Sequence, residues 1–124
     1  MPCLYCHWAA RHGRHAGVPE TRVCMSCHGL IDKQPDGFAP VAEAHARGAA
    51  IEWAAVHDLP DHTWFSHAAH EAAEVGCDEC HGEVERMARV EQAATMSMGW
   101  CLDCHREPRE GLEKATTDCF ACHR

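Results

Sequence analysis

The amino-acid sequence predicts a mostly α-helical protein with extensive loops and little or no β-sheet. Three observations support this prediction. The pattern Cys-x-x-Cys-His occurs five times in 124 residues and uses all ten cysteines. The apolar residues between these motifs have the short, helical spacing of amphipathic turns rather than the alternation of strands. Glycine and proline are frequent around the motifs, as expected for a chain that bends around bound groups.

The five motifs have the sequence at which c-type haem is attached. The two thiols add to the vinyl groups of the porphyrin, and the histidine that follows binds the iron from one face. A zinc protein would need the cysteine pairs to combine into four-ligand sites, and ten thiols with five matched histidines divide badly that way. A disulfide framework would not explain the histidines. The predicted attachment residues are Cys3, Cys6 and His7; Cys24, Cys27 and His28; Cys77, Cys80 and His81; Cys101, Cys104 and His105; and Cys119, Cys122 and His123.

The predicted fold is therefore that of a small multihaem cytochrome c, in which short helices wrap around a cluster of five haems c. The length suits one domain that spans residues 1–124. Within this domain, residues 1–30 form a part with two haems and residues 77–124 a part with three. Residues 31–76 contain no attachment motif, and we expect this segment to provide ligands for the second face of the irons.

Local signals predict three short helices between the motifs. One follows Pro40, covers residues 41–47 and ends at Gly48. A second begins with Ser66 as its N-cap and covers residues 67–74. A third is expected over residues 83–93, where Val84 and Met87 mark one face.

The histidines outside the motifs are candidates for the distal axial position of each iron. We expect His67 and His70 to be distal ligands, because residues three apart on a helix share a face and each can reach a different iron. His57 and His62 flank a Leu-Pro-Asp turn and are the next candidates. Large aromatic side chains are expected to pack against the porphyrins: Trp8, Trp53, Trp64, Phe65 and Trp100.

One iron is expected to have a methionine ligand, which raises the reduction potential relative to two histidines. Met98 is the predicted thioether ligand and Met87 its rival, with core filling as the alternative for both. His15 or His12, between the first two motifs, is an alternative to one of these ligands. His45 is expected to lie at the surface.

The charge and hydropathy restrict the partners and the location. The formal net charge of −8 argues against nucleic acid as a partner. It fits a docking partner with a basic patch, although solubility alone explains it equally well. The mean hydropathy of −0.39 and the lack of a long apolar run do not indicate a membrane-embedded chain. Because c-type haem is attached outside the cytoplasm, we expect a periplasmic or other extracytoplasmic location, with a signal or membrane anchor upstream of Cys3.

Several segments in this order resemble the pentahaem cytochrome c subunit of alternative complex III. They are residues 24–28, 51–62, 64–70, 77–82 and 98–106. The block from Phe65 to His70 also resembles the Phe-x-His-x-x-His pattern of class III multihaem cytochromes. In those proteins the two histidines are distal ligands, one to the adjacent haem and one to a more distant haem.

The resemblance implies an electron-transfer subunit without a catalytic residue of its own. Its implied partners are the iron–sulfur subunit and the polytopic membrane subunits of a quinol-oxidising complex. The implied acceptor is a monohaem cytochrome, a copper protein or an oxidase. Two other functions remain open at the level of the sequence: a multihaem reductase with one open haem, and a subunit of a conductive filament built by head-to-tail contacts.

Overall fold

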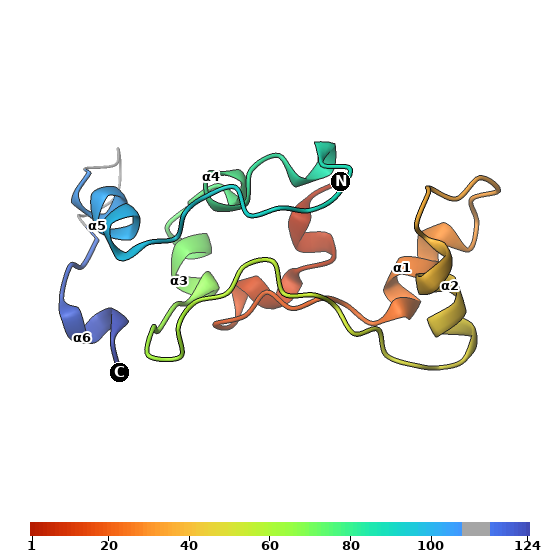
Figure 1. The fold of residues 1–124 in the computed structure, drawn as a ribbon, viewed down its shortest axis with the longest axis horizontal. Helices are drawn as coiled ribbons and strands as arrows, with labels where there is room; N and C mark the ends of the chain where they lie inside the picture. Colours follow the sequence, from red (N-terminus) through yellow and green to blue (C-terminus); the bar gives the residue numbers. More distant parts are fainter. Residues whose placement is uncertain (108–114) are drawn as a thin grey trace.

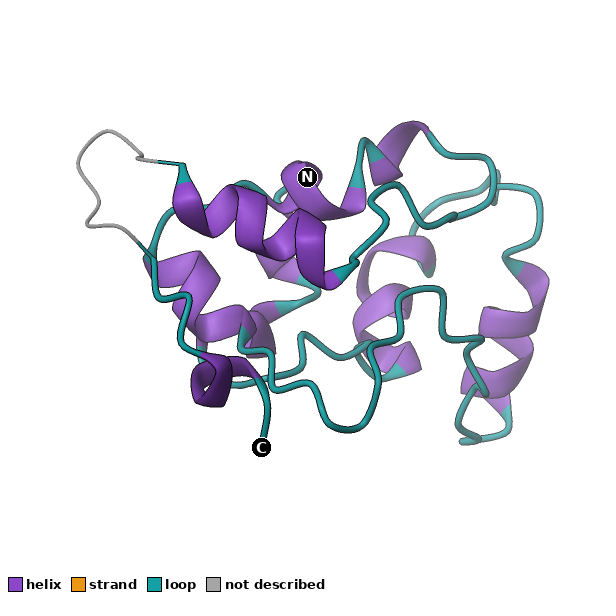
Figure 2. Ribbon diagram, turned by 60° about the vertical axis from the view of Figure 1, so that its left-hand side comes forward, coloured by secondary structure: helices purple, strands orange, loops and turns teal. Residues whose placement is uncertain are grey.

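The computed structural model describes residues 1–107 and 115–124, where short helices are joined by long loops (Figure 2). In chain order the elements are the 3-10 helices η1 (Cys3–Tyr5) and η2 (Trp8–Arg11), the α-helices α1 (Thr21–His28), α2 (Ala39–Ala46), α3 (His67–Ala72) and α4 (Cys77–His81), the 3-10 helix η3 (Val84–Arg86), and the α-helices α5 (Met98–Arg106) and α6 (Cys119–Cys122). The described residues form no β-strand, and one isolated antiparallel bridge joins Thr63 to His123. The predicted fold class is therefore confirmed.

Every Cys-x-x-Cys-His motif folds into a single helical turn or lies within a helix. In the first and the last motif, the amide of the histidine donates a hydrogen bond to the carbonyl of the first cysteine, at 2.9 Å for His7 and 2.8 Å for His123. Residues three apart on such a turn lie on one face. The local fold therefore places both thiols of each motif on the same side of the turn.

The helices lie in three groups along the long axis of the molecule (Figure 1). At one end, α2 packs along α1; near the middle, α3 packs against η2. The helices α5 and α6 lie at the other end, close to the C-terminus. Within the second group, the amide of Ala68 donates to the carbonyl of Gly13 at 3.0 Å, which attaches α3 to the loop after η2.

Two of the three predicted interior helices are confirmed. The helix expected over 41–47 is α2, and Gly48 follows it with a φ of +62°. The helix expected over 67–74 is α3, where the hydroxyl of Ser66 accepts a hydrogen bond from the amide of Ala69 at 3.3 Å.

The helix predicted over residues 83–93 is wrong. Only the 3-10 turn η3 forms there, and Met87 already has an extended backbone. An isolated helix of this length is marginal in water and needs an apolar face that packs on a partner. Val84 and Val90 remain 37% and 42% exposed, so this segment has no such face.

The peptide buries very little of its own apolar surface. Among the described residues, Ala10 and Ala44 are the only buried hydrophobic side chains. Large side chains such as Trp8, Trp53 and Phe120 are mostly exposed. Of the described helices, none has the length and apolar character needed to cross a membrane. What positions the functional side chains is thus a set of capped turns and loops rather than a conventional core.

Candidate haem-binding sites

The thiols of the five motifs follow one another through the molecule in an order that differs from their order in the chain. Burial and the adjacent Cys3 thiol raise the pKa of Cys77, so the first and third motifs lie side by side. Burial and then the neighbouring Cys122 raise the pKa of Cys101, which places the fourth motif beside the fifth. None of the ten cysteines forms a disulfide.

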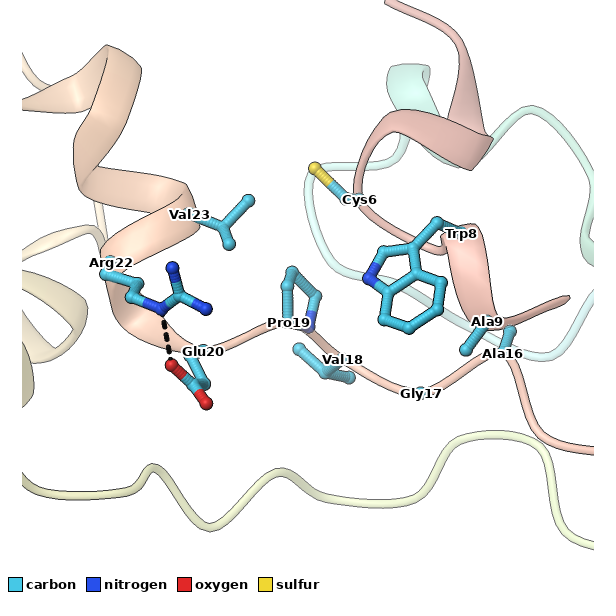
Figure 3. A pocket seen from close by; sticks show the side chains of 10 residues that line it. All are labelled: Cys6, Trp8, Ala9, Ala16, Gly17, Val18, Pro19, Glu20, Arg22 and Val23. Carbon is cyan, nitrogen blue, oxygen red and sulfur yellow. Dashed lines mark hydrogen bonds and ion pairs between the residues drawn. The ribbon is translucent and has the colours of Figure 1, made fainter. Parts of the chain in front are cut away.

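A pocket of about 260 Å³ lies between the first and second motifs. Cys6 enters it from the first motif, and Val23, which precedes Cys24, enters it from α1 (Figure 3). Trp8 and Pro19 supply apolar walls, and the lining is completed by the linker that joins η2 to α1. A flat apolar ring tethered to the first or second motif fits such a lining.

Three motif histidines each face a second histidine from another part of the chain. The ring centroids are 6.2 Å apart for His67 and His81, 5.9 Å for His70 and His105, and 5.6 Å for His62 and His123. Bonds between a metal ion and an imidazole nitrogen are about 2 Å long, so two imidazoles on opposite faces of one iron have centroids roughly 6 Å apart. The three pairs therefore have the spacing that one iron between two imidazoles requires.

Four of the histidines have Nδ1 on a backbone carbonyl, which selects the tautomer that binds iron through Nε2. The Nδ1 atom of His67 lies 2.6 Å from the carbonyl of Arg14, and that of His70 lies 2.8 Å from the carbonyl of Ser66. In the motifs, His105 Nδ1 lies 2.7 Å from the Thr116 carbonyl, and His7 Nδ1 lies 2.5 Å from the Gly17 carbonyl. A carbonyl accepts only from a protonated Nδ1, which leaves a lone pair on Nε2 for a metal.

His57 lies beside the third motif, with its ring centroid 4.4 Å from that of His81. Its Nε2 atom is buried and has no hydrogen-bond partner in the described chain. A buried imidazole nitrogen without a partner is unfavourable in a peptide alone and is satisfied by a metal ion. Burial, followed by the nearby His57, His67 and His7, lowers the pKa of His81, which favours the neutral imidazole that binds iron.

His28 is held differently from the other motif histidines, by two residues that the sequence reasoning missed. The Nδ1 atom of His28 lies 2.9 Å from the amide oxygen of Gln34. The ring of Phe38 stacks on the His28 ring with a centroid distance of 4.0 Å and an angle of 20°. No sequence spacing marks Gln34 or Phe38 as a partner of His28, because both contacts depend on the path of the turn between α1 and α2.

The other candidate ligands are not paired with a motif histidine in the described chain. Met98 lies in the first turn of α5 with its side chain 66% exposed, and Met87 follows η3. His12 lies 6.0 Å from the Trp8 ring, His15 is exposed, and His45 Nδ1 lies 3.3 Å from the Thr21 hydroxyl.

The aromatic residues expected to pack on porphyrins lie near the paired histidines in two cases. The Phe65 ring is 4.9 Å from that of His67 and 4.5 Å from that of His70. Trp64 lies beside the last motif, where its amide donates to the Cys122 carbonyl at 2.6 Å. Trp53 and Trp8 are mostly exposed.

The donor set fits covalently attached haem rather than a bare metal ion. No cluster of three or more histidine, cysteine or acidic side chains gathers within residues 1–107 and 115–124, as a zinc site would require. Pairs of thiols on one face of a turn, imidazoles that face each other and exposed apolar side chains together define a small multihaem cytochrome c.

The chain belongs to the family described as cytochrome c7 and related cytochrome c, which matches residues 63–124. It is also similar to the multihaem cytochrome c subunit of menaquinone reductase from Nitratidesulfovibrio vulgaris (strain Hildenborough). The two are 31% identical over an alignment of 148 positions that covers all of this chain and 70% of the relative. The chain is thus an electron-transfer protein that binds haem c.

Proposed function

We propose that this protein carries electrons through five haems c, one at each motif, as the relay subunit of a quinone-linked membrane complex. The observation that carries the proposal is the continuous series of attachment motifs. The second motif adjoins the first across the pocket, the first adjoins the third, and the fourth adjoins the fifth. Helix α3 joins the third and fourth motifs, because His67 faces His81 and His70 faces His105.

The proposed axial ligands follow from the same contacts. We assign His67 to the iron of His81, His70 to that of His105 and His62 to that of His123. His57 is assigned to the iron of His7. Its Nε2 has no hydrogen-bond partner in the described chain, and both His57 and His7 lie near His81. The thiols that would hold the five haems belong to the same motifs as the proximal histidines: Cys3 and Cys6, Cys77 and Cys80, Cys101 and Cys104, Cys119 and Cys122, and, for His28, Cys24 and Cys27.

The proposed set leaves the distal ligand of the iron on His28 unassigned. Met98 lies on α5, at the opposite end of the molecule from α1 (Figure 1). We therefore do not assign Met98 to that iron. That Met98 ligates one of the irons remains a prediction from the sequence.

Bound haem c supplies reversible one-electron chemistry at its iron. The contribution of this chain is to orient the imidazoles through their Nδ1 hydrogen bonds and to hold the attachment turns in series. A short, fixed separation between neighbouring sites is what a relay needs, and the adjacent thiols of Cys3 with Cys77 and of Cys101 with Cys122 provide it.

The resemblance to the pentahaem subunit of alternative complex III supports membership in a quinol-oxidising complex on the extracytoplasmic face of a membrane. The relative's name, menaquinone reductase, supports a quinone-linked complex but indicates the opposite direction of electron flow. The proposed companions are an iron–sulfur subunit and polytopic membrane subunits. The proposed acceptor is a monohaem cytochrome, a copper protein or an oxidase.

Purification of the native protein tests the proposal. Membranes would be solubilised in mild detergent, the haem-stained complex isolated, and its subunits identified by mass spectrometry. We expect five haems from the intact mass of this subunit, together with an iron–sulfur subunit and quinone-binding membrane subunits. Fewer haems, or a subunit that purifies alone from soluble fractions, would contradict the proposal.

A potentiometric titration of the same complex tests the direction of flow. Haem potentials that rise from the quinone-facing end would support quinol oxidation. Potentials that rise toward the quinone-facing end would support quinone reduction, as the relative's name indicates.

A further inference from the structure

Two arginines gather on one tryptophan beside the last attachment motif. The guanidinium carbon of Arg14 lies 3.8 Å from the centroid of the Trp64 ring, and that of Arg124 lies 4.5 Å from it. We call Arg14, Trp64 and Arg124 the arginine cluster. Stacking on an aromatic face holds a guanidinium in place while its donors stay available for hydrogen bonds.

These two arginines differ from most other arginines of the chain in having no carboxylate partner. Arg11, Arg22, Arg47, Arg86 and Arg106 each lie within 4.0 Å of an acidic side chain. Neither Arg14 nor Arg124 forms an ion pair within the described residues. In a chain with a net charge of −8, two cations on one ring without an acidic partner are unexpected unless an anion belongs there.

The cluster lies between two of the proposed haem sites. The amide of Trp64 donates to the Cys122 carbonyl, and Arg124 directly follows His123, which faces His62. On the other side, the carbonyl of Arg14 accepts from Nδ1 of His67, which faces His81. The Nε of Arg14 donates to the Phe65 carbonyl at 3.4 Å, so its two terminal nitrogens remain for a further acceptor.

We propose that Arg14 and Arg124 bind the propionate carboxylates of the haem attached to Cys119 and Cys122. Haem carries two carboxylates at one edge, and a guanidinium matches a carboxylate with two parallel hydrogen bonds. The inference rests on the proposed function, because it needs a haem at the last motif. It goes beyond that function by naming the groups that neutralise this haem and thereby set its potential.

The charge of the cluster predicts the direction of the effect on the potential. Reduction adds an electron to the iron, so nearby positive charge favours the reduced state and an uncompensated propionate favours the oxidised state. Loss of the two arginines therefore lowers the reduction potential of the haem at the last motif. The effect is large only if the pairing is direct, since exposed charges are screened by salt.

The test uses holoprotein with its haem count confirmed by intact mass. Arg14→Gln with Arg124→Gln removes both charges. Arg47→Gln is the control, because Arg47 is exposed at the end of α2 and pairs with Glu43, one turn earlier, at 3.7 Å. The readouts are an optical redox titration and the propionate bending band in the resonance Raman spectrum.

We expect the double variant to lower the potential of one haem, with a roughly tenfold smaller equilibrium constant for its reduction (about 59 mV for a one-electron couple). The propionate band should shift in the same variant, and neither readout should change in the control. A second double variant, Arg14→Lys with Arg124→Lys, keeps the charge but not the paired geometry. This lysine variant should shift the propionate band but leave the reduction potential of the haem nearly unchanged. It also tests the inference if the glutamine variant fails to fold.

Unchanged potentials and an unchanged band, with all haems present, would overturn the inference. The arginine cluster would then bind carboxylates of a partner protein, or an adventitious ion only. A changed potential with an unchanged band would also overturn it. If the wild-type protein lacks a haem at Cys119 and Cys122, the haem count of the proposed function fails first, and the inference fails with it.

Discussion

At the scale of single residues, the recurring unit is an imidazole whose Nδ1 is anchored by a backbone carbonyl and whose ring faces a second imidazole. His70 is one example, anchored by Ser66 and 5.9 Å from His105 between ring centroids. Such an anchor fixes the ring before the metal binds and strengthens the ligand. The same pattern recurs at His67, which is anchored by the Arg14 carbonyl and faces His81.

Replacing His70 by alanine tests the assigned pairing. We expect His70→Ala to leave the iron of His105 with five ligands, so that the reduced protein binds one equivalent of carbon monoxide more than the unmutated protein and gains a high-spin signal. His45→Ala is the control, because His45 is exposed on α2 and its ring lies beside the Thr21 hydroxyl rather than beside a motif histidine. Carbon monoxide binding that is equal in both variants would contradict the assignment.

A glycine directly after the third motif has a conformation that other residues rarely adopt. Gly82 has φ +68° and ψ −170°, a region that is essentially restricted to glycine. A Cβ added there would lie 2.9 Å from the Cβ of Ala93 and 3.1 Å from the Cε of Met87. We expect Gly82→Ala to lower the free energy of unfolding of the holoprotein by about 1–3 kcal/mol.

Denaturant titration followed at the haem absorption band measures this loss. Gly13→Ala is the control, since Gly13 has no positive φ and the nearest atom to an added Cβ is 3.9 Å away. Equal stability of the two variants would show that the strain at Gly82 is relieved by movement of the loop.

At the scale of elements, short helices begin at side-chain caps. The hydroxyls of Ser66 and Ser97 cap α3 and α5, and the carboxylate of Asp118 caps α6. Helices this short are not stable by themselves. A cap therefore decides whether the histidines on α3 are presented at all.

The Ser66→Ala variant should weaken the helix that presents His67 and His70. Loss of a serine N-cap costs about 0.5–2 kcal/mol. We expect this loss in the unfolding free energy of the holoprotein, together with faster hydrogen exchange at the amides of α3. Ser26→Ala provides a comparison, because the Ser26 hydroxyl donates to the Val23 carbonyl within α1 and caps nothing. An effect of equal size there would contradict a capping role.

The sequence was sufficient to predict the elements that depend on local signals. Gly48 and Ser66 marked the boundaries of α2 and α3 because caps act over a few residues. The segment 83–93 has helical spacing but forms only a 3-10 turn, since such spacing without a partner face is not enough to form a helix. The pairing of His62 with His123 and the roles of Gln34 and Phe38 depend on the path of the whole chain, and no spacing encodes them.

At the scale of the whole molecule, the attachment motifs are arranged in space as second, first, third, fourth and fifth. The first motif lies between the second and third because its Cys6 lies across the pocket from α1 and its Cys3 adjoins Cys77. A relay therefore has its ends at α1 and at α6 (Figure 1). The spacing of motifs along the sequence gives no information on this order, since it comes from the loops that cross between the ends.

The energetics of the whole molecule depend on the attached groups. Ordering the backbone costs about 1–2 kcal/mol per residue, whereas burying a large apolar side chain returns only about 1.5–3 kcal/mol. Ala10 and Ala44, both small, are the only buried apolar side chains in the described chain. The peptide contacts alone are thus far from offsetting the cost of ordering, and the porphyrin surfaces have to supply the difference.

The chain made without haem should therefore remain unfolded. Production in the cytoplasm, where the thiols stay unmodified, gives the material for this test. We expect a far-ultraviolet circular dichroism spectrum of low helical content, no cooperative thermal transition and unprotected amides, whereas the holoprotein should unfold cooperatively. A holoprotein variant with Cys119→Ala and Cys122→Ala should keep cooperative unfolding, because four motifs and the pairs around α3 remain. A cooperative transition in the haem-free chain would contradict the argument and would mean that contacts among the peptide segments, not the haems, determine the order of the motifs.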